Sequence, residues 1–185
     1  RFEYPSDDMF TNYTPTYALF HGTIGYTVEC GENNEASVTM GKYGLIGHTA
    51  YVAENKDDLY LNQLEFFRRA LNNEESPETE KWFVTQDNQV EANFREKDEY
   101  GKFYPEYYVI PTDADSQRDI ADAYFMQEYF IRNGVQVEKL TQDVTVDGVT
   151  YKAGAFVIDM HQISRSFANA VLYKGKIVKN WTGLY

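Results

Sequence analysis

The segment His21-Gly-Thr-Ile-Gly-Tyr-Thr-Val-Glu29 predicts a short β-strand that ends in a carboxylate. Over residues 23–28 apolar and polar side chains alternate, as they do along a strand with one buried face. Glu29 follows at the carboxyl end of this strand, which is where open α/β sheets bind their ligands. The same pattern also fits an exposed glutamate at a strand end that has no chemical role.

A helical pattern follows over residues 45–73 and indicates a scaffold. Its apolar residues at helical spacing are Ile46, Ala50, Ala53, Tyr60, Leu64, Phe67 and Leu71. Asp57 and Asp58 suit the first turn of a helix, so the pattern predicts either one bent helix or two consecutive helices. Before the strand, Pro5 and Pro15 predict that residues 1–20 form an irregular loop.

A boundary between two domains is predicted near residue 78. Residues 72–80 are polar and acidic and contain Pro77, which is typical of a linker. The first domain is therefore expected to span residues 1–78, and the second is expected to span residues 79–185.

The second domain alternates strand and helix patterns. Its helix is expected to begin at a cap formed by Asp115 or Ser116 and to end at Asn133-Gly134. The dipeptide Asp147-Gly148 favours a type I′ hairpin turn. The expected strands cover residues 107–110, 135–137 and 155–158, with a hairpin over 144–151, and the expected helices cover 116–132 and 163–173. This order implies a βαβ crossover with a parallel core and a hairpin insertion.

Composition limits the classes of function. The net charge of −12 argues against a nucleic-acid partner, because a phosphate-binding face needs a basic excess. No apolar run approaches the ~20 residues of a membrane span, and the single Cys30 excludes a disulfide within the chain. The heavy aromatic content suggests an extracellular or cell-surface protein, and both ends, at Arg1 and Tyr185, look truncated, so we expect a fragment of something longer.

Two short motifs resemble a known family. Gly25-Tyr-Thr-Val-Glu29, followed by Gly41-Lys-Tyr-Gly-Leu45 and a helical pattern, resembles the zinc carboxypeptidases of the carboxypeptidase A-like type. The resemblance implies that Glu29 is the catalytic general base. In that family a tyrosine on a mobile loop before the glutamate closes over the substrate, which makes Tyr17 and Tyr13 weaker substrate-binding candidates. A packing role is the alternative for both tyrosines.

The rest of the chain resembles the α/β domain that follows the peptidase domain in many bacterial members. The matching segments are Pro105-Glu-Tyr-Tyr-Val-Ile-Pro111, Gly134-Val-Gln-Val137, Tyr151-Lys-Ala-Gly-Ala-Phe-Val157 and Met160-His-Gln162 with Arg165. The expected fold class is therefore α/β. The end of a carboxypeptidase-like mixed sheet with a long helix would be followed by a small flavodoxin- or amidotransferase-like domain. Amidotransferase chemistry is not expected, because this half of the chain lacks a cysteine nucleophile.

The metal half of such a site is missing from the sequence. In the family zinc is held by a His-x-x-Glu pair and a second histidine, and none of His21, His48 and His161 begins a His-x-x-Glu. Zinc is thus expected in the intact parent protein and not in this chain alone, with no metal ligand among its residues. The expected partners are a peptide substrate and the missing N-terminal part of the same protein.

The functional expectation is a fragment of a zinc metallocarboxypeptidase that acts on the C-terminal residues of peptides, cell-wall peptides included. The fragment alone is expected to be inactive. A relative that has lost its metal and an accidental likeness around Glu29 are the other interpretations of the motif. The alternative from another functional class is a non-catalytic module that binds peptides or carbohydrates.

Overall fold

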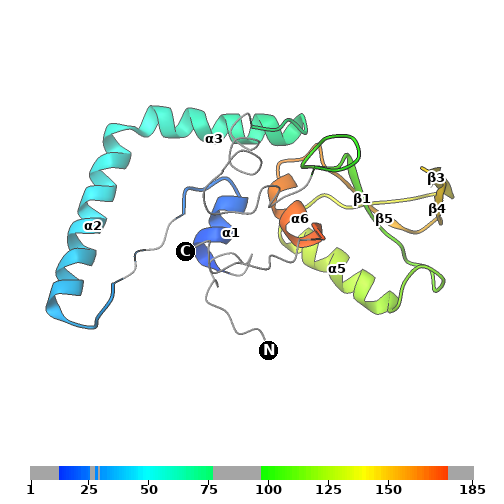
Figure 1. The fold of residues 1–185 in the computed structure, drawn as a ribbon, viewed down its shortest axis with the longest axis horizontal. Coiled ribbons are helices and arrows are strands. Elements are labelled where there is room, and N and C mark those ends of the chain that lie inside the picture. Colours follow the sequence, from blue (N-terminus) through cyan, green and yellow to red (C-terminus); the bar gives the residue numbers. More distant parts are fainter. Residues whose placement is uncertain (1–12, 26–27, 29, 77–96, 175–185) are drawn as a thin grey trace. The chain divides into compact units, whose positions relative to one another are not determined.

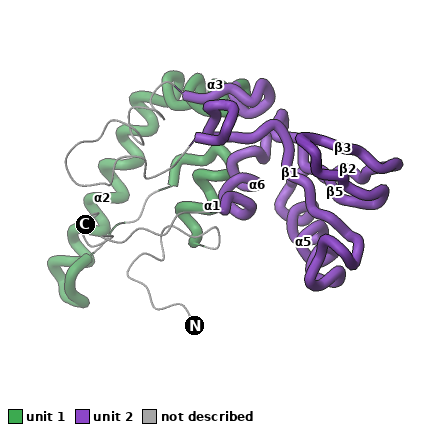
Figure 2. Tube along the Cα trace, turned by 45° about the vertical axis from the view of Figure 1, so that its right-hand side comes forward, with its two compact units in different colours: residues 1–68 green, residues 69–185 purple. Residues whose placement is uncertain are grey.

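The computed structural model describes residues 13–25, 28, 30–76 and 97–174. These residues form two compact units, Arg1–Arg68 and Arg69–Tyr185, which Figure 2 shows in different colours. The domain boundary that the sequence predicts near residue 78 falls outside the described residues. The fold is mixed α/β, with helices and small antiparallel sheets.

The first unit begins with helix α1 (Thr14–Phe20). Pro15 lies in its first turn, where the missing N–H costs nothing and the fixed φ angle suits the helix. The expectation of an irregular loop is therefore wrong for residues 14–20. The helix ends at Phe20 with His21 as its C-cap, and Gly22 follows with a φ of 78° that few other residues adopt. The N–H groups of Gly22 and Thr23 close this turn by donating to the carbonyl oxygens of Leu19 and Ala18.

Two further helices follow, α2 (Glu35–Glu54) and α3 (Lys56–Leu71). The Asn34 side chain caps α2 by accepting a hydrogen bond from the Ser37 N–H at 3.0 Å. The helices are separated at Asn55, so of the two predicted alternatives the pair of helices is confirmed (Figure 1). Helix α2 starts ten residues earlier than the sequence predicts, and Gly41-Lys-Tyr-Gly-Leu45 lies inside it.

The predicted strand is not formed in its described part. Thr23, Ile24 and Gly25 have no regular secondary structure, while Tyr26, Thr27 and Glu29 lie outside the described residues. The reason is local: the chain leaves α1 through the left-handed turn at Gly22 and then lies against α3. A Cβ atom at Gly22 would stand 2.6 Å from the ring of Phe67. Gln63 of α3 also donates to the Gly22 carbonyl oxygen at 2.8 Å.

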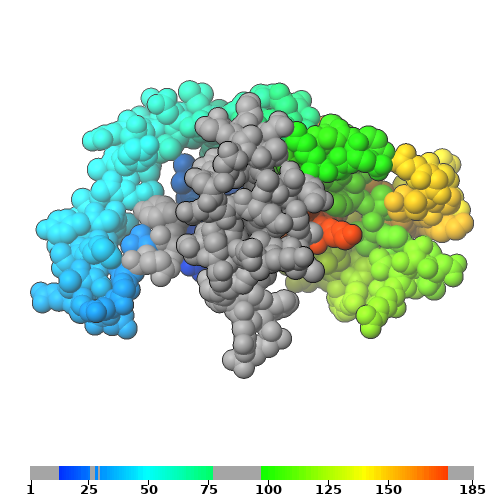
Figure 3. All heavy atoms as spheres, in the orientation of Figure 1, coloured from blue at the N-terminus to red at the C-terminus, as the bar shows by residue number. Residues whose placement is uncertain are grey.

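Helix α2 buries none of its residues. Its exposed large apolar side chains, which belong to the cyan spheres of Figure 3, are Val38, Met40, Tyr43, Leu45, Ile46, Tyr51 and Val52. Within the part of the chain that the structure describes, no helix combines the length and apolar character needed to cross a lipid bilayer.

The second unit follows the predicted order of elements. After β1 (Tyr107–Ile110) and α5 (Ile120–Arg132) come β2 (Glu138–Lys139), the hairpin strands β3 (Val144–Val146) and β4 (Val149–Tyr151), β5 (Phe156–Asp159) and α6 (Arg165–Leu172). The hairpin prediction is confirmed, because β3 pairs with β4 and both turn residues, Asp147 and Gly148, have positive φ angles. Asn133 and Gly134 end α5 as predicted, but its N-cap is Asp119 rather than Asp115 or Ser116.

The sheet order β1-β5-β2 corrects the expected parallel core. Strand β5 pairs antiparallel with β1 on one side and with β2 on the other. The two outer strands therefore run in the same direction, as a crossover through α5 requires, but β5 separates them. In the register, Val157 of β5 lies opposite both Val109 and Glu138.

The hydrophobic core of the second unit lies between helices α5 and α6 and strand β5. The largest fully buried side chains are Phe130, Phe167, Ile158 and Met160. Alternation along β5 explains why Phe156 and Ile158 are buried. Tyr124 of α5 meets Phe156 edge to face, with the ring centroids 5.2 Å apart.

Candidate functional site

A pocket of about 490 Å³ lies in the first unit. It is lined by Thr23, Ile24, His48, Tyr51, Val52, Lys56, Leu59, Tyr60 and Gln63. Its walls thus come from the ends of α2 and α3 that face Asn55, and from the segment that leads toward Glu29. The volume is within the range of small-molecule sites.

Sequence and local folding explain why these residues meet. The break at Asn55 ends α2 and starts α3, and the Asn55 side chain donates to the Tyr51 carbonyl oxygen at 2.9 Å. Gln63 then fixes the segment after α1 by its bond to the Gly22 oxygen, which brings Thr23 and Ile24 to the pocket. The pocket is therefore built by two separate parts of the sequence, residues 48–63 on both sides of the break between α2 and α3 and the segment after α1.

Tyr13 and Tyr17, the substrate-binding residues that the sequence predicts, are not among the described residues that line this pocket. Glu29 lies outside the described residues, so its role stays a prediction. Tyr13 precedes α1 as its N-cap residue, and Tyr17 lies within that helix. The Tyr17 ring stacks on the His21 ring with the centroids 4.2 Å apart. Their assignment to substrate binding also stays a prediction.

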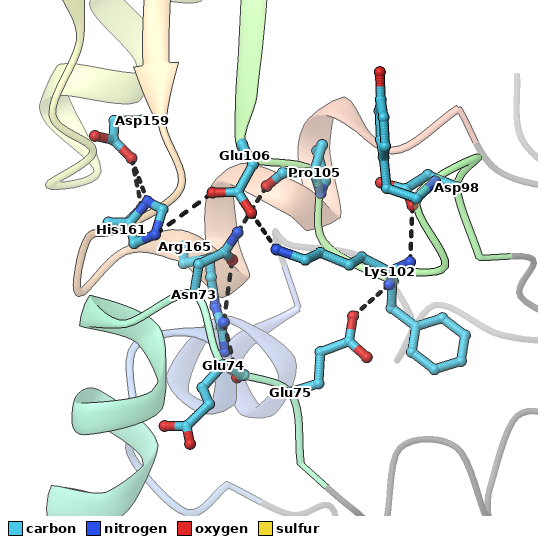
Figure 4. A network of polar contacts seen from close by, with 12 residues as sticks. Asn73, Glu74, Glu75, Asp98, Lys102, Pro105, Glu106, Asp159, His161 and Arg165 are labelled. Carbon is cyan, nitrogen blue, oxygen red and sulfur yellow. Dashed lines mark hydrogen bonds and ion pairs between the residues drawn. The ribbon is translucent and has the colours of Figure 1, made fainter.

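The second unit holds a polar network around Glu106 (Figure 4). The Asp159 carboxylate accepts from the His161 backbone N–H at 2.8 Å and lies 2.9 Å from the ring Nδ1. The other ring nitrogen, Nε2, is 3.5 Å from Glu106 Oε2. Lys102 pairs with the same glutamate. His161 therefore lies between two carboxylates on the surface of this unit.

Charges in this network shift two pKa values. The hydrogen bond from Lys102 lowers the pKa of Glu106, and desolvation opposes this only in part. The same bond raises the pKa of Lys102. Both groups are exposed to solvent, so their pairing contributes little to stability.

Beneath this surface Arg165 is a buried cation with an exposed fraction of 5%. Its Nη1 donates to the Asn73 side-chain oxygen at 3.2 Å and to the Glu74 carbonyl oxygen at 3.0 Å. The guanidinium lies over the Tyr104 ring, 4.2 Å from the centroid. Its Nε has no hydrogen-bond partner within the described residues. Burial lowers the pKa of Arg165, and Tyr104 and Glu75 counteract only part of this effect.

Asn73 connects Arg165 to the chain after α3. Its side chain also donates to the Pro105 carbonyl oxygen at 3.0 Å. Its φ of 46° places it in the left-handed region, where it ends α3. The Asn73 and Glu74 N–H groups donate to the carbonyl oxygens of Ala70 and Arg69. One residue thus terminates a helix and holds a buried arginine.

The donor set does not fit a zinc site. Among residues 13–25, 28, 30–76 and 97–174 no group of three or more His, Cys, Asp or Glu side chains could hold a metal ion. His161 directs its two nitrogens at different carboxylates, so the three groups do not converge on one point. Cys30 is exposed and lies 3.8 Å from the Ser37 carbonyl oxygen.

No family model, curated protein or solved structure matches the chain. The interpretation of the site therefore depends on its own residues. The pocket can accept an apolar group beside a lysine, whereas the Glu106 network places a histidine ring between two carboxylates at the surface.

Sequence reasoning missed Lys56 and Tyr60 as pocket residues and treated residues 45–73 as a scaffold only. The break at Asp57 and Asp58 was the available signal, since a junction between helices is a common place for a pocket. Asn73 and Glu106 gave no local signal, because their partners are distant in the sequence.

Proposed function

We propose that this chain is part of a zinc-dependent metallocarboxypeptidase that hydrolyses the C-terminal residues of peptides. Glu29 is the general base, which takes a proton from the attacking water. The observation that carries the proposal is the family-like order of residues in the segment 21–29. Two described residues of this segment, Thr23 and Ile24, also line the pocket of the first unit.

The proposal assigns zinc to the intact parent protein. Because the described residues do not fit a zinc site, the proposal requires the ligands to come from another part of that protein. This chain alone is then inactive. The proposed location is extracellular or at the cell surface, and the proposed substrates include cell-wall peptides.

Residues 79–185 are the proposed accessory domain, of the flavodoxin- or amidotransferase-like type. The succession β1, α5, β2, a hairpin, β5 and α6 supports this assignment. The antiparallel pairing of β5 with both neighbours differs from the parallel sheet expected for such a domain. We assign it no amidotransferase activity.

A non-catalytic module that binds peptides or carbohydrates is the second candidate. The observation that favours it is the pocket of the first unit, which Tyr51 and Tyr60 help to line. Aromatic side chains provide apolar surface with a polar end, which suits both kinds of ligand.

The deciding experiment uses the full-length protein and its Glu29→Gln variant. The substrates are a blocked dipeptide with a free C-terminal carboxylate and the same dipeptide with an amidated C-terminus. We expect Glu29→Gln to retain zinc, measured by elemental analysis, and to lower kcat by several orders of magnitude. Cleavage is expected only for the free carboxylate.

The matched control is Glu32→Gln, which removes a nearby exposed carboxylate and should leave kcat unchanged. Unchanged activity in Glu29→Gln would disprove the role of Glu29 as the base. A parent protein that binds ligand but holds no zinc and cleaves neither dipeptide would establish the binding module instead.

A further inference from the structure

The pocket in the first unit has mostly apolar and aromatic walls. Ile24, Val52 and Leu59 supply aliphatic surface, and Tyr51 and Tyr60 supply two rings. About 490 Å³ accommodates a group of the size of a large amino-acid side chain or a short acyl chain. Burial of such a group is favourable because it removes apolar surface of both partners from water.

The polar side chains of the pocket differ in whether they already make hydrogen bonds or ion pairs within the protein. The Gln63 amide nitrogen donates to the Gly22 oxygen and thereby holds one wall in place. The Lys56 ammonium makes no hydrogen bond or ion pair with any residue in the described ranges. Of the lining residues Lys56 has the only side chain with a permanent charge. The pocket therefore combines apolar walls with one cation that has no partner among the described residues.

We propose that this pocket binds a small apolar monocarboxylate, with its apolar body between Tyr51 and Tyr60 and its carboxylate on the Lys56 ammonium. The two sources of this chemistry are the C-terminal residue of a peptide and a free amphipathic acid. Lysine provides a point charge that a carboxylate can approach from several directions, which suits a wide pocket better than a fixed bidentate geometry.

The peptide terminus as the source rests on the proposed function, whereas binding of a free acid goes beyond it. None of the pocket residues is assigned to the hydrolytic step. Its test measures binding to the chain alone, which the proposed function expects to be inactive. A failure of the pocket proposal leaves the role of Glu29 unaffected, and loss of the role of Glu29 leaves the pocket unaffected.

The probes are N-acetyl-phenylalanine, its uncharged amide, and octanoate. Each is titrated into the isotope-labelled chain, and the amide resonances of residues 48–63 are followed by NMR. We expect saturable shifts around Tyr51 and Tyr60 with a Kd on the order of 1 mM for the carboxylates. The amide should bind about five-fold more weakly, which is the scale of an exposed ion pair.

The diagnostic variant is Lys56→Gln, and the matched control is Lys42→Gln on the exposed surface of α2. Lys56→Gln should weaken binding of N-acetyl-phenylalanine about five-fold and abolish the preference over its amide. Lys42→Gln should change neither value. The circular dichroism of both variants checks that the helices are intact.

Tighter binding of N-acetyl-phenylalanine than octanoate would support the peptide terminus as the source, and the reverse order would support the free acid. Either result supports the shared chemistry. The proposal is overturned by the absence of saturable shifts up to about 10 mM, by shifts confined to other parts of the chain, or by equal affinity for the acid and its amide.

Discussion

Replacement of Asn73 tests the central claim about the second unit, that one residue ends α3 and holds the buried Arg165. The Asn73→Ala variant removes the bonds to Arg165 Nη1 and to the Pro105 carbonyl oxygen. It also places alanine at a φ of 46°, where the Cβ atom is strained. The Asn73→Gly variant removes the same two bonds but adopts this backbone conformation freely.

The magnitudes follow from these contacts. Loss of the bond to the charged guanidinium costs about 2 kcal/mol, and loss of the neutral bond to Pro105 costs about 1 kcal/mol. The left-handed conformation adds about 1 kcal/mol for alanine. We therefore expect Asn73→Ala to lower the free energy of unfolding by about 4 kcal/mol and Asn73→Gly by about 3 kcal/mol.

The assay is urea unfolding followed through the NMR amide resonance of Ile158, since this buried residue of β5 reports on the second unit alone. A local probe is needed because a chain with two units need not unfold in one step. Values within about 0.5 kcal/mol of the wild type for both variants would refute the claim that Asn73 holds Arg165. Equal values for Ala and Gly would refute only the backbone part of the reasoning.

Two further predictions concern charge pairs of the second unit. The Tyr100 hydroxyl donates a hydrogen bond of 2.6 Å to Asp147, and this bond, together with desolvation, raises the pKa of Tyr100 to about 12. Asp147→Asn should therefore return this pKa toward 10.0, as measured by NMR titration of the ring carbon. An unchanged pKa would show that the bond is absent in solution. Asp143 accepts from Lys152 Nζ and the Ala153 N–H, each at 2.9 Å, which lowers its pKa. This pairing stabilises the folded state above the ordinary pKa of the carboxyl group and is lost as the pH falls through the lowered one. Lys152→Met should raise the pKa of Asp143 in a carbon-13 titration, and a constant pKa would contradict the pairing.

Turns and helix ends could be predicted from the sequence because they depend on a few neighbouring residues. The hairpin at Asp147-Gly148 and the end of α5 at Asn133 depend on backbone preferences of one or two residues, and both are formed. Pro15 shows the limit of such reasoning. A proline breaks a helix interior but suits a first turn, and only the following residues distinguish the two cases.

Pairings between distant residues could not be predicted from the sequence. The bond between Arg165 and Asn73 joins positions 92 residues apart, and no periodic pattern connects them. The same holds for β5, whose apolar residues suit a central strand but do not specify its neighbours. Of the candidate pocket, the segment 21–29 and the break between the helices were accessible from the sequence, but their meeting through Gln63 was not.

The position of β5 between β1 and β2 determines when the second unit can fold during synthesis. Neither outer strand pairs with the other, so the sheet cannot close until Asp159 has left the ribosome. By then β1, α5 and β2 have already been synthesised, and the edges of the two outer strands stay unpaired until β5 is available. Closing the loop from Ile110 to Phe156 carries an entropic cost that slows this step. Chains that stop before Phe156 should therefore expose two unpaired edges and aggregate.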